Sequence, residues 1–450
     1  MLVNRVQRGR YLDSVALMRI ARRLTELPGV EVAALMIGTP SNKALLADAR
    51  LLSADGEAAE PNDLLIAVRA ADPSVPLALA ERLLTEPAPA APETLRRTRT
   101  LEAALAAEPT ANLALISVPG EYAAAEARRA LERGLHAMVF SDNVPIEEEV
   151  ALKRFAAERG LLVMGPDCGT ALIGGAPLAF ANAVPRGDIG IVSASGTGLQ
   201  EVSCLVARLG GGVSHGIGVG GRDLDERVGA RGMLAAIEAL EADAGTRTLV
   251  LISKPPAPRI AQQVLERARR SAKRVVLCFL GAQGGTLAQA AEAATGHKIE
   301  YAPPALPKRN GAVRGLYCGG TLAAEAALIL RAAGAPGECV DLGDDRYTRG
   351  RPHPMIEPEL RNEHIARAAA DPTVGVLLFD LVLGYGAHPD PAGVLIAGLR
   401  GAKQLAIASV TGTEQDPQRW SPQVAALRAG GVHVAPSNAH AAMLAAAAVS

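Results

Sequence analysis

Aromatic residues are scarce in this 450-residue chain, in which one Trp, six Tyr and five Phe make up 3%. So few aromatic rings leave little material for stacking on nucleic-acid bases. The formal net charge is −1 and no long basic block occurs, so the electrostatic footprint of a nucleic-acid-binding protein is missing. No apolar run reaches the ~20 residues of a membrane-spanning helix. The first residues, MLVNRVQRGRYLDS, lack the apolar core of a secretion signal.

Cysteine is also sparse, and its pattern argues against disulfides and structural zinc. The number of cysteines is odd and no CxxC pair occurs, which favours a reduced, cytoplasmic protein. HxxxH and EF-hand spacings are absent as well. We therefore expect no metal site and no membrane or nucleic-acid partner. The cysteines are Cys168, Cys204, Cys278, Cys318 and Cys339.

What the chain does contain is a repeated alternation of short apolar runs, Gly-containing loops and Ala/Leu/Arg/Glu-rich segments of helical length. Continuous apolar runs are typical of strands buried on both faces, as parallel strands are. The alternation predicts an α/β protein with several doubly wound parallel sheets. The predicted strands are residues 32–37, 113–118, 137–140, 161–164, 189–193, 248–253, 274–279, 374–379 and 404–409.

Proline-rich stretches indicate where domains end. The stretch 85–99, TEPAPAAPETLRRTR, predicts an exposed connector, and 301–315, YAPPALPKRNGAVRG, predicts an interdomain linker. We predict three domains, at 1–186, 187–305 and 312–450.

Two Gly-rich turns follow predicted strands and open predicted helices. The stretch GIVSASGTGLQEVSCLVARLG, 190–210, is echoed by RGLYCGGTLAAEAALILRAAG, 314–334. Free N–H groups and the positive dipole end at a helix start attract phosphate or carboxylate, and Gly lets the backbone come close. A plain strand–helix turn with a hydroxyl N-cap is the alternative. The predicted phosphate-binding residues are Ser195, Gly196, Thr197, Gly319, Gly320 and Thr321.

Three further stretches place polar residues at predicted strand ends, where ligands bind in open α/β sheets. Asp167 and Cys168 lie in GPDCGT, Arg222 and Asp223 in GIGVGGRDLDE, and Lys254 in SKPPA. Because Arg can hold a carboxylate or phosphate through two parallel hydrogen bonds, these stretches predict substrate contacts. A turn around a buried thiol and a surface loop with local ion pairs are the alternatives for the first two.

The densest polar stretch is DLGDDRYTRGRPHPM, residues 341–355. Its arginines, among them Arg349 and Arg351, suit an anionic substrate, and His353 is a candidate proton carrier. A solvated loop is the alternative reading of this stretch.

These motifs together resemble a known set. GIVSASGTGLQE resembles the phosphate-site turn of the succinyl-CoA synthetase alpha subunit, and GPDCGT and GIGVGGRD resemble two further segments of that subunit. LYCGGTLAAEA, DLGDD and LGYGAHPDPAG occur in the same order in the carboxyl-terminal domain of the beta subunit. An alpha subunit followed by that domain is the arrangement of the FdrA family, which the chain resembles over nearly its whole length.

The resemblance implies a Rossmann-like domain of CoA-binding type at 1–186 and flavodoxin-like domains at 187–305 and 312–450. Family members are acyl-CoA synthetase-like proteins, and some are implicated, with two companion subunits, as components of oxamate carbamoyltransferase in allantoin breakdown. The resemblance also implies a small anionic substrate, with phosphate or carbamoyl phosphate as substrate or product. Whether the chain forms a homo-oligomer is left open. We assign catalysis to His353, Lys254 and Arg222, and substrate binding to Asp167, Cys168, Asp223, Arg349 and Arg351.

The sequence differs from the synthetase at two motifs, and these differences limit the reactions that the chain is expected to catalyse. Its phosphorylated histidine stands in a GHAG context, whereas residues 278–295 here hold no histidine and His297 is the nearest. Its nucleotide loop, GxTGxxG, reads IGTPSNK here, which argues against CoA, and no ATP-grasp half is present. The first hypothesis is therefore a carbamoyltransferase component that uses phosphate without ATP. A ligase subunit phosphorylated on His297 and a non-catalytic anion-binding scaffold are the alternatives.

Overall fold

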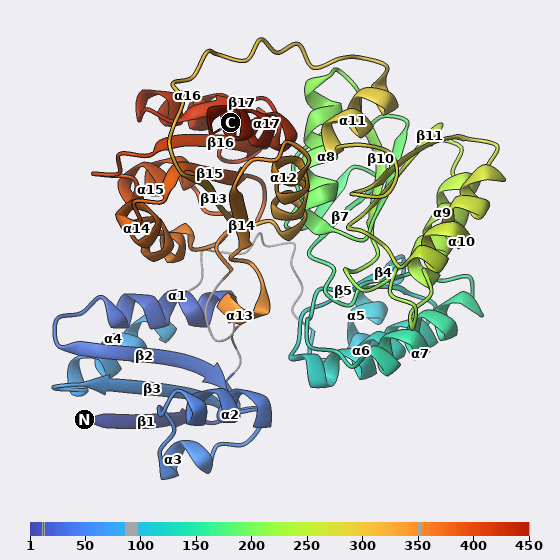
Figure 1. The fold of residues 1–450 in the computed structure, drawn as a ribbon. Coiled ribbons are helices and arrows are strands. Elements are labelled where there is room, and N and C mark those ends of the chain that lie inside the picture. The colour runs from blue at the N-terminus through green and yellow to red at the C-terminus, as the bar shows by residue number, and fades with distance from the viewer. Residues whose placement is uncertain (11, 13, 86–97, 349–352, 450) are drawn as a thin grey trace. The chain divides into compact units, whose positions relative to one another are not determined.

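The computed structural model describes residues 1–10, 12, 14–85, 98–348 and 353–449. They fall into two compact units, which begin at Met1 and at Thr100 and are called here the N-terminal unit and the main unit (Figure 1). Most of the predicted connector at 85–99, together with Arg349 and Arg351, lies outside the described residues. Among the helices that are described, none combines the length and the apolar character that crossing a bilayer requires.

The N-terminal unit is a three-stranded antiparallel sheet covered by helices on both faces. Strand order is β1-β3-β2, and side chains alternate between the faces of β3. Ile66 packs with Leu17 and Leu77 in one apolar cluster, whereas Leu65 packs with Leu46 in another. The elements are β1 (Leu2–Gln7), α1 (Ser14–Thr25), β2 (Val30–Ile37), α2 (Pro40–Asp48), α3 (Ala54–Glu57), β3 (Leu64–Ala70) and α4 (Ser74–Thr85).

This unit differs from the predicted Rossmann-like domain at 1–186. Its sheet is antiparallel, and residues 100–347 belong to the main unit. The central strand β3 is buried on both faces, so it reads as the continuous apolar run that usually marks a parallel strand. The stretch IGTPSNK lies here, at the start of α2, where Thr39 caps the helix by accepting from the N–H of Asn42. It is therefore not the counterpart of a nucleotide loop in a parallel sheet.

The main unit begins with a small parallel sheet of order β4-β5-β6. Helices α6 and α7 pack on it through an alanine-rich cluster that includes Ala123, Ala127 and Leu152. The elements are α5 (Leu101–Ala107), β4 (Leu113–Ile116), α6 (Gly120–Glu132), β5 (His136–Val139), α7 (Ile146–Ala157) and β6 (Val163–Met164).

A six-stranded sheet of order β12-β11-β9-β10-β7-β8 follows. Its first four strands are parallel, and the β7–β8 hairpin adds to the edge in antiparallel fashion. The predicted boundary at 186 therefore falls inside the segment that contributes to this sheet. The elements are β7 (Thr170–Ile173), β8 (Ala176–Ala179), β9 (Ile189–Ser193), α8 (Gly196–Arg208), β10 (Val213–Gly218), α9 (Arg231–Ala242), β11 (Thr248–Ser253), α10 (Pro258–Arg269), β12 (Arg274–Phe279) and α11 (Leu287–Thr295).

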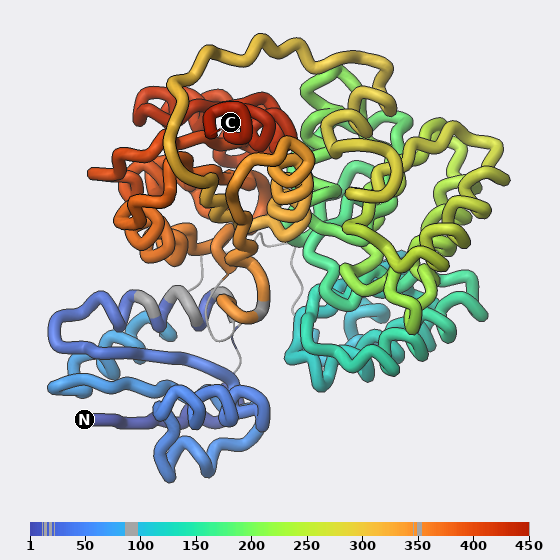
Figure 2. The backbone as a smooth tube through the Cα atoms, in the orientation of Figure 1, coloured from blue at the N-terminus to red at the C-terminus, as the bar shows by residue number. Residues whose placement is uncertain are grey.

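The last sheet is fully parallel, with order β14-β13-β15-β16-β17. An extended segment leads into it from α11 (Figure 2), and the N–H of Arg309 donates to the carbonyl of Ala448. The elements are β13 (Ala312–Tyr317), α12 (Gly320–Ala332), β14 (Gly337–Asp341), α13 (Asp345–Thr348), the 3-10 helix η1 (Pro358–Arg361), α14 (Asn362–Ala370), β15 (Val374–Val382), α15 (Pro391–Gly398), β16 (Leu405–Thr411), α16 (Trp420–Ala429), β17 (His433–Ala435) and α17 (Asn438–Val449).

The five- and six-stranded sheets share one apolar core. Leu199 and Val202 of α8 belong to the same buried cluster as Leu322 and Ala326 of α12. Because each helix starts at the carboxyl end of its preceding strand, this packing brings the two helix N-termini to the same place. The prediction of an α/β protein with parallel sheets is confirmed.

Candidate functional site

The first Gly-rich turn connects the fully buried strand β9 to α8. Ser195 is the N-cap of α8, and its Oγ accepts from the N–H of Gly198 at 2.9 Å. Ser193 stabilises the turn through two hydrogen bonds to Ser195. Its Oγ donates to the carbonyl of Ser195 at 2.7 Å and accepts from the N–H of Ser195 at 3.1 Å. A Cβ on Gly196 would stand 3.0 Å from Oγ1 of Thr170, so the turn needs a glycine where it approaches β7.

The second turn connects β13 to α12 and rests on a buried carboxylate. Asp380, at 0% exposure, accepts from the N–H groups of Cys318 and Gly319, both at 2.8 Å. Arg361, which is 2% exposed, lies 3.2 Å from the same carboxylate and also donates to the carbonyl of Asp380 at 2.7 Å. The N–H groups of Cys318 and Gly319 are therefore taken, and those from Gly320 onward point out of the helix start.

The two turns touch each other. Ser195 Oγ donates to Thr321 Oγ1 at 2.5 Å, and a Cβ on Gly319 would stand about 3 Å from three atoms of Thr197. Neither helix carries an acidic residue in its first turn. Two positive dipole ends thus meet. The Asp380 carboxylate takes the N–H groups of Cys318 and Gly319, and an anion at the N–H groups that follow would be stabilised by both helix ends.

Two predicted catalytic residues lie beside the second turn. The position of a Cβ on Gly320 is 2.9 Å from Nζ of Lys254, and the position of a Cβ on Gly343 is 2.4 Å from Nε2 of His353 and 2.7 Å from the carbonyl oxygen of Cys318. Lys254 and His353 therefore converge on one turn although 98 positions separate them in the chain.

Burial sets the protonation of the histidine. It lowers the pKa of His353 to about 4, so the imidazole is neutral at pH 7. Nδ1 of His353 accepts from the N–H of Met355 at 3.2 Å, which leaves the proton of the neutral ring on Nε2. A neutral Nε2–H group can donate to an oxyanion but adds no charge to the site.

A carboxylate that sequence reasoning had not singled out completes the site. Asp341 ends β14; its Oδ1 accepts from the N–H of Gly343 at 2.9 Å, and its Oδ2 lies 2.2 Å from the position of a Cβ on Gly320. Burial raises the pKa of Asp341, and the Lys254 ammonium works in the opposite direction. The Asp341 carboxylate and the Lys254 ammonium therefore both lie next to Gly320, the first residue of α12.

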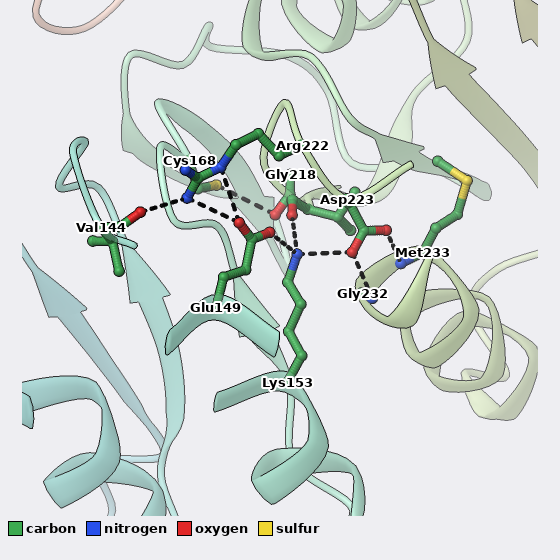
Figure 3. Close-up of polar contacts among 10 residues, drawn as sticks. Val144, Glu149, Lys153, Cys168, Gly218, Arg222, Asp223, Gly232 and Met233 are labelled. Atoms are coloured by element: carbon green, nitrogen blue, oxygen red, sulfur yellow. Dashed lines mark hydrogen bonds and ion pairs between the residues drawn. The ribbon is translucent and has the colours of Figure 1, made fainter. Parts of the chain in front are cut away.

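Arg222 and Asp223 belong to a different cluster (Figure 3). Lys153 Nζ lies 2.7 Å from both Glu149 and Asp223 and donates to the carbonyl of Val219 at 2.9 Å. Asp223, at 0% exposure, also accepts from the first N–H groups of α9, and Arg222 pairs with Glu149 at 3.0 Å. The predicted substrate role of Asp223 is wrong, because its carboxylate caps α9 and pairs with a buried lysine. The Arg222 side chain is 41% exposed, and its catalytic role stays a prediction.

Cys168 is a buried core thiol rather than a substrate contact. Its Sγ donates to the carbonyl of Gly218 at 3.3 Å (Figure 3), and burial raises its pKa to about 12. A protonated, hydrogen-bonded thiol of this kind is inert, so the turn with a buried thiol is the correct alternative. Asp167 is exposed with φ +57°, and its substrate role stays a prediction.

The histidine required by the ligase hypothesis lies away from the two turns. Thr295, two residues before His297, contacts Gly211 beyond the carboxyl end of α8. Thirteen helical residues separate that end from Ser195, a distance of roughly 20 Å. The position of His297 thus offers no phosphohistidine at the facing turns.

The first strand-to-helix turn of the β4-β5-β6 sheet leads through Pro119, which has no N–H, to a single glycine, Gly120, and then to the acidic Glu121. A Cβ on Gly120 would meet the carbonyl of Asp142 at 2.2 Å, so that glycine serves packing. The expectation that the chain does not bind CoA stays a prediction.

Two cavities of the main unit lie elsewhere. One of about 480 Å³ lies between Tyr301, Arg428 and Leu444, and one of about 210 Å³ lies at Tyr385 and Gln418. Neither is lined by a residue of the facing turns.

Comparisons with known proteins agree with this division of the chain. Residues 316–448 match the family model described as CoA-ligase, and residues 1–101 match the model described as AllF, heavy metal-associated domain. The solved dinucleotide forming acetyl-coenzyme A synthetase 1 from Ca. Korarchaeum cryptofilum aligns with 75% of this chain and 82% of its own, at 16% identity and a TM-score of 0.32.

Curated relatives cover the chain to different extents. The alpha subunit 2 of an ADP-forming succinate–CoA ligase from Archaeoglobus fulgidus is 27% identical over 33% of this chain and 51% of that subunit. The uncharacterized protein YahF of Escherichia coli (strain K12) is 41% identical over 97% of this chain and 96% of YahF. The chain therefore belongs to the same family as YahF.

Proposed function

We propose that the chain is the subunit of an oxamate carbamoyltransferase-type enzyme that binds phosphate and transfers a carbamoyl group to it. The observation that carries this proposal is the pair of facing helix N-termini, in which Ser195 and Thr321 are hydrogen-bonded at 2.5 Å and neither first turn is acidic. The match of residues 1–101 to an AllF domain and the resemblance to the FdrA family support the choice of reaction.

The reaction is cleavage of a ureido acid such as oxalurate by phosphate. A phosphate oxygen bonds to the carbamoyl carbon, the bond from that carbon to the amide nitrogen breaks, and the phosphate proton ends on that nitrogen. The products are oxamate and carbamoyl phosphate. No ATP is consumed, which agrees with the lack of a histidine at residues 278–295, the stretch that corresponds to the phosphorylated segment of the synthetase.

Named residues have distinct roles in this proposal. The N–H groups that follow Gly320, with the hydroxyls of Thr197 and Thr321, bind phosphate, and Lys254 neutralises its charge. Neutral His353 donates to the oxyanion that forms on the carbamoyl oxygen. Asp341 lies next to Lys254 and carries the proton from phosphate to the leaving amide nitrogen.

The test is phosphate-dependent formation of carbamoyl phosphate from oxalurate by the purified chain with its two companion subunits. Lys254→Met and His353→Phe should each lower the turnover rate at least tenfold, while an exposed control, Lys298→Met, should not. A wild-type complex that makes no carbamoyl phosphate from oxalurate or other ureido acids would refute the proposed reaction.

A further inference from the structure

The N-terminal unit matches a domain model described as heavy metal-associated. Soft and borderline heavy metals bind thiolate and imidazole ligands. Residues 1–101 contain neither cysteine nor histidine. Among the described residues of the whole chain, no group of three or more His, Cys, Asp or Glu side chains is placed to hold a metal ion.

The remaining soft ligands of the unit are three thioethers in separate elements. Met1 precedes β1, Met18 lies in α1 and Met36 in β2. The amino group of Met1 donates to the carbonyl of Ala70 at 2.7 Å, and Met36 packs in an apolar cluster under α2. The residues present therefore do not fit a heavy metal.

Loops in the unit are instead fastened by buried side chains that bond to the backbone. Asp63, which is 6% exposed, accepts from the N–H of Gly9 through Oδ1 at 2.9 Å and from the N–H of Glu60 through Oδ2 at 3.0 Å. These two backbone bonds lower the pKa of the Asp63 carboxyl. Asn4, 5% exposed, fastens a second loop by donating to the carbonyl of Leu51 and accepting from the N–H of Ser53.

Asp63 links the residues after β1 to the loop before β3. Gly9 has φ +59°, a left-handed conformation that glycine adopts readily. The hydrogen bond from its N–H to the Asp63 carboxylate is charge-assisted and joins the two segments, while the bond from Glu60 lies within the loop before β3.

We infer that the N-terminal unit keeps the fold of a heavy metal-associated domain without metal chemistry, and that the Asp63 carboxylate is the clamp that holds its β1–α1 and α3–β3 loops. The clamp works only while Asp63 is ionised. Its contribution is therefore present above the unfolded pKa of an aspartate and is lost as the pH falls through the lower folded value.

Hydrogen–deuterium exchange of the full chain, resolved by peptide, tests both halves of this inference. Addition of Zn²⁺ or Cu⁺ should leave the exchange of peptides from residues 1–85 unchanged, whatever the metal does in the main unit. Slower exchange of these peptides with either metal would overturn the absence of metal chemistry.

The clamp is tested by Asp63→Asn. The asparagine NH2 group cannot accept a hydrogen bond, so one of the two backbone N–H groups loses its partner, and the negative charge is lost as well. Peptides that contain Gly9 and Glu60 should exchange about tenfold faster or more at neutral pH, while the matched exposed control Asp48→Asn should exchange like wild type. Equal exchange in Asp63→Asn and wild type would overturn the role of Asp63.

Discussion

Replacing Asp341 by Asn should remove a coupling between anion binding and proton uptake. The carboxylate lies at Gly320, the first residue of α12, so an anion held by the helix start would sit roughly 5 Å from it. One unit charge at that distance contributes about 3 kcal/mol at an effective dielectric constant of ~20. The same repulsion raises the pKa of Asp341 further when the anion is bound, in addition to the rise that burial causes.

The sign of the effect follows from these shifts. The anion-bound state has the higher pKa, so binding takes up a proton and weakens as the pH rises through the pKa of the bound state. Lys254 opposes the uptake, and Asp344 and Asp380 promote it. His353 lies next to Gly343 and is neutral, so it adds no charge that would change the pKa of Asp341.

Calorimetry with sulfate is the suitable assay, because sulfate does not titrate near neutral pH and phosphate does. Wild type should take up a fraction of a proton on binding sulfate, measured as a dependence of the binding heat on the ionisation enthalpy of the buffer. Its affinity should fall as the pH rises, by at most about tenfold per pH unit. Asp341→Asn should bind sulfate without uptake, whereas Asp344→Asn should keep the uptake but show it at lower pH, because the Asp344 charge helps to raise the pKa of Asp341. Uptake that persists in Asp341→Asn but disappears in His353→Asn would refute the reasoning.

Three further outcomes follow from the structure. Thr321→Val should weaken phosphate binding by about 1.5–3 kcal/mol, or roughly 10- to 150-fold in Kd by calorimetry, because a buried hydroxyl is lost, whereas Thr321→Ser should bind like wild type. Lys153→Met should lower the free energy of unfolding in urea by about 3–5 kcal/mol, since it removes the lysine partner of two buried carboxylates and leaves Glu149 only Arg222 and Asp223 only backbone N–H groups; a loss no larger than that of Arg222→Met would count against the network. Burial raises the pKa of Glu325 to about 7, so its proton stabilises the folded state below pH ~4.5 and that stability is lost as the pH rises through about 7. Glu325→Gln should therefore remove roughly 3 kcal/mol of the decline in unfolding free energy between pH 5 and 8, and an unchanged decline would contradict the assignment.

The parallel part of the fold was predictable because its strands are buried on both faces. The strands at 189–193, 248–253 and 274–279 were located to the residue. The antiparallel N-terminal sheet was not. Only the strand at 32–37 was predicted there, and β1 and β3 were missed; the continuous apolar run of β3, which has helices on both faces, does not reveal antiparallel partners. Hydrophobic periodicity reports burial and does not report strand direction.

The two Gly-rich turns were predictable because each is formed by residues that are consecutive in the sequence. Asp341 and Asp380 were missed because their roles arise from contacts across the sheet: Asp380 reaches the turn at 318–319 from another strand. Asp223 looked like a substrate contact because its glycine-rich surroundings resemble a ligand loop, yet its partners are a lysine on α7 and the start of α9. No pattern within either segment indicates such pairings.

The central claim is that an anion binds between the turns at 195–197 and 319–321. Crystals of the chain soaked with arsenate, a tetrahedral phosphate analogue with an anomalous signal, locate such an anion directly. The account predicts an anomalous peak within hydrogen-bond distance of the N–H groups at the start of α12 and of the hydroxyls of Thr197 and Thr321, lost in Thr321→Val. Arsenate that binds elsewhere on the chain, with the Ser195–Thr321 hydrogen bond intact and no peak between the turns, would contradict it.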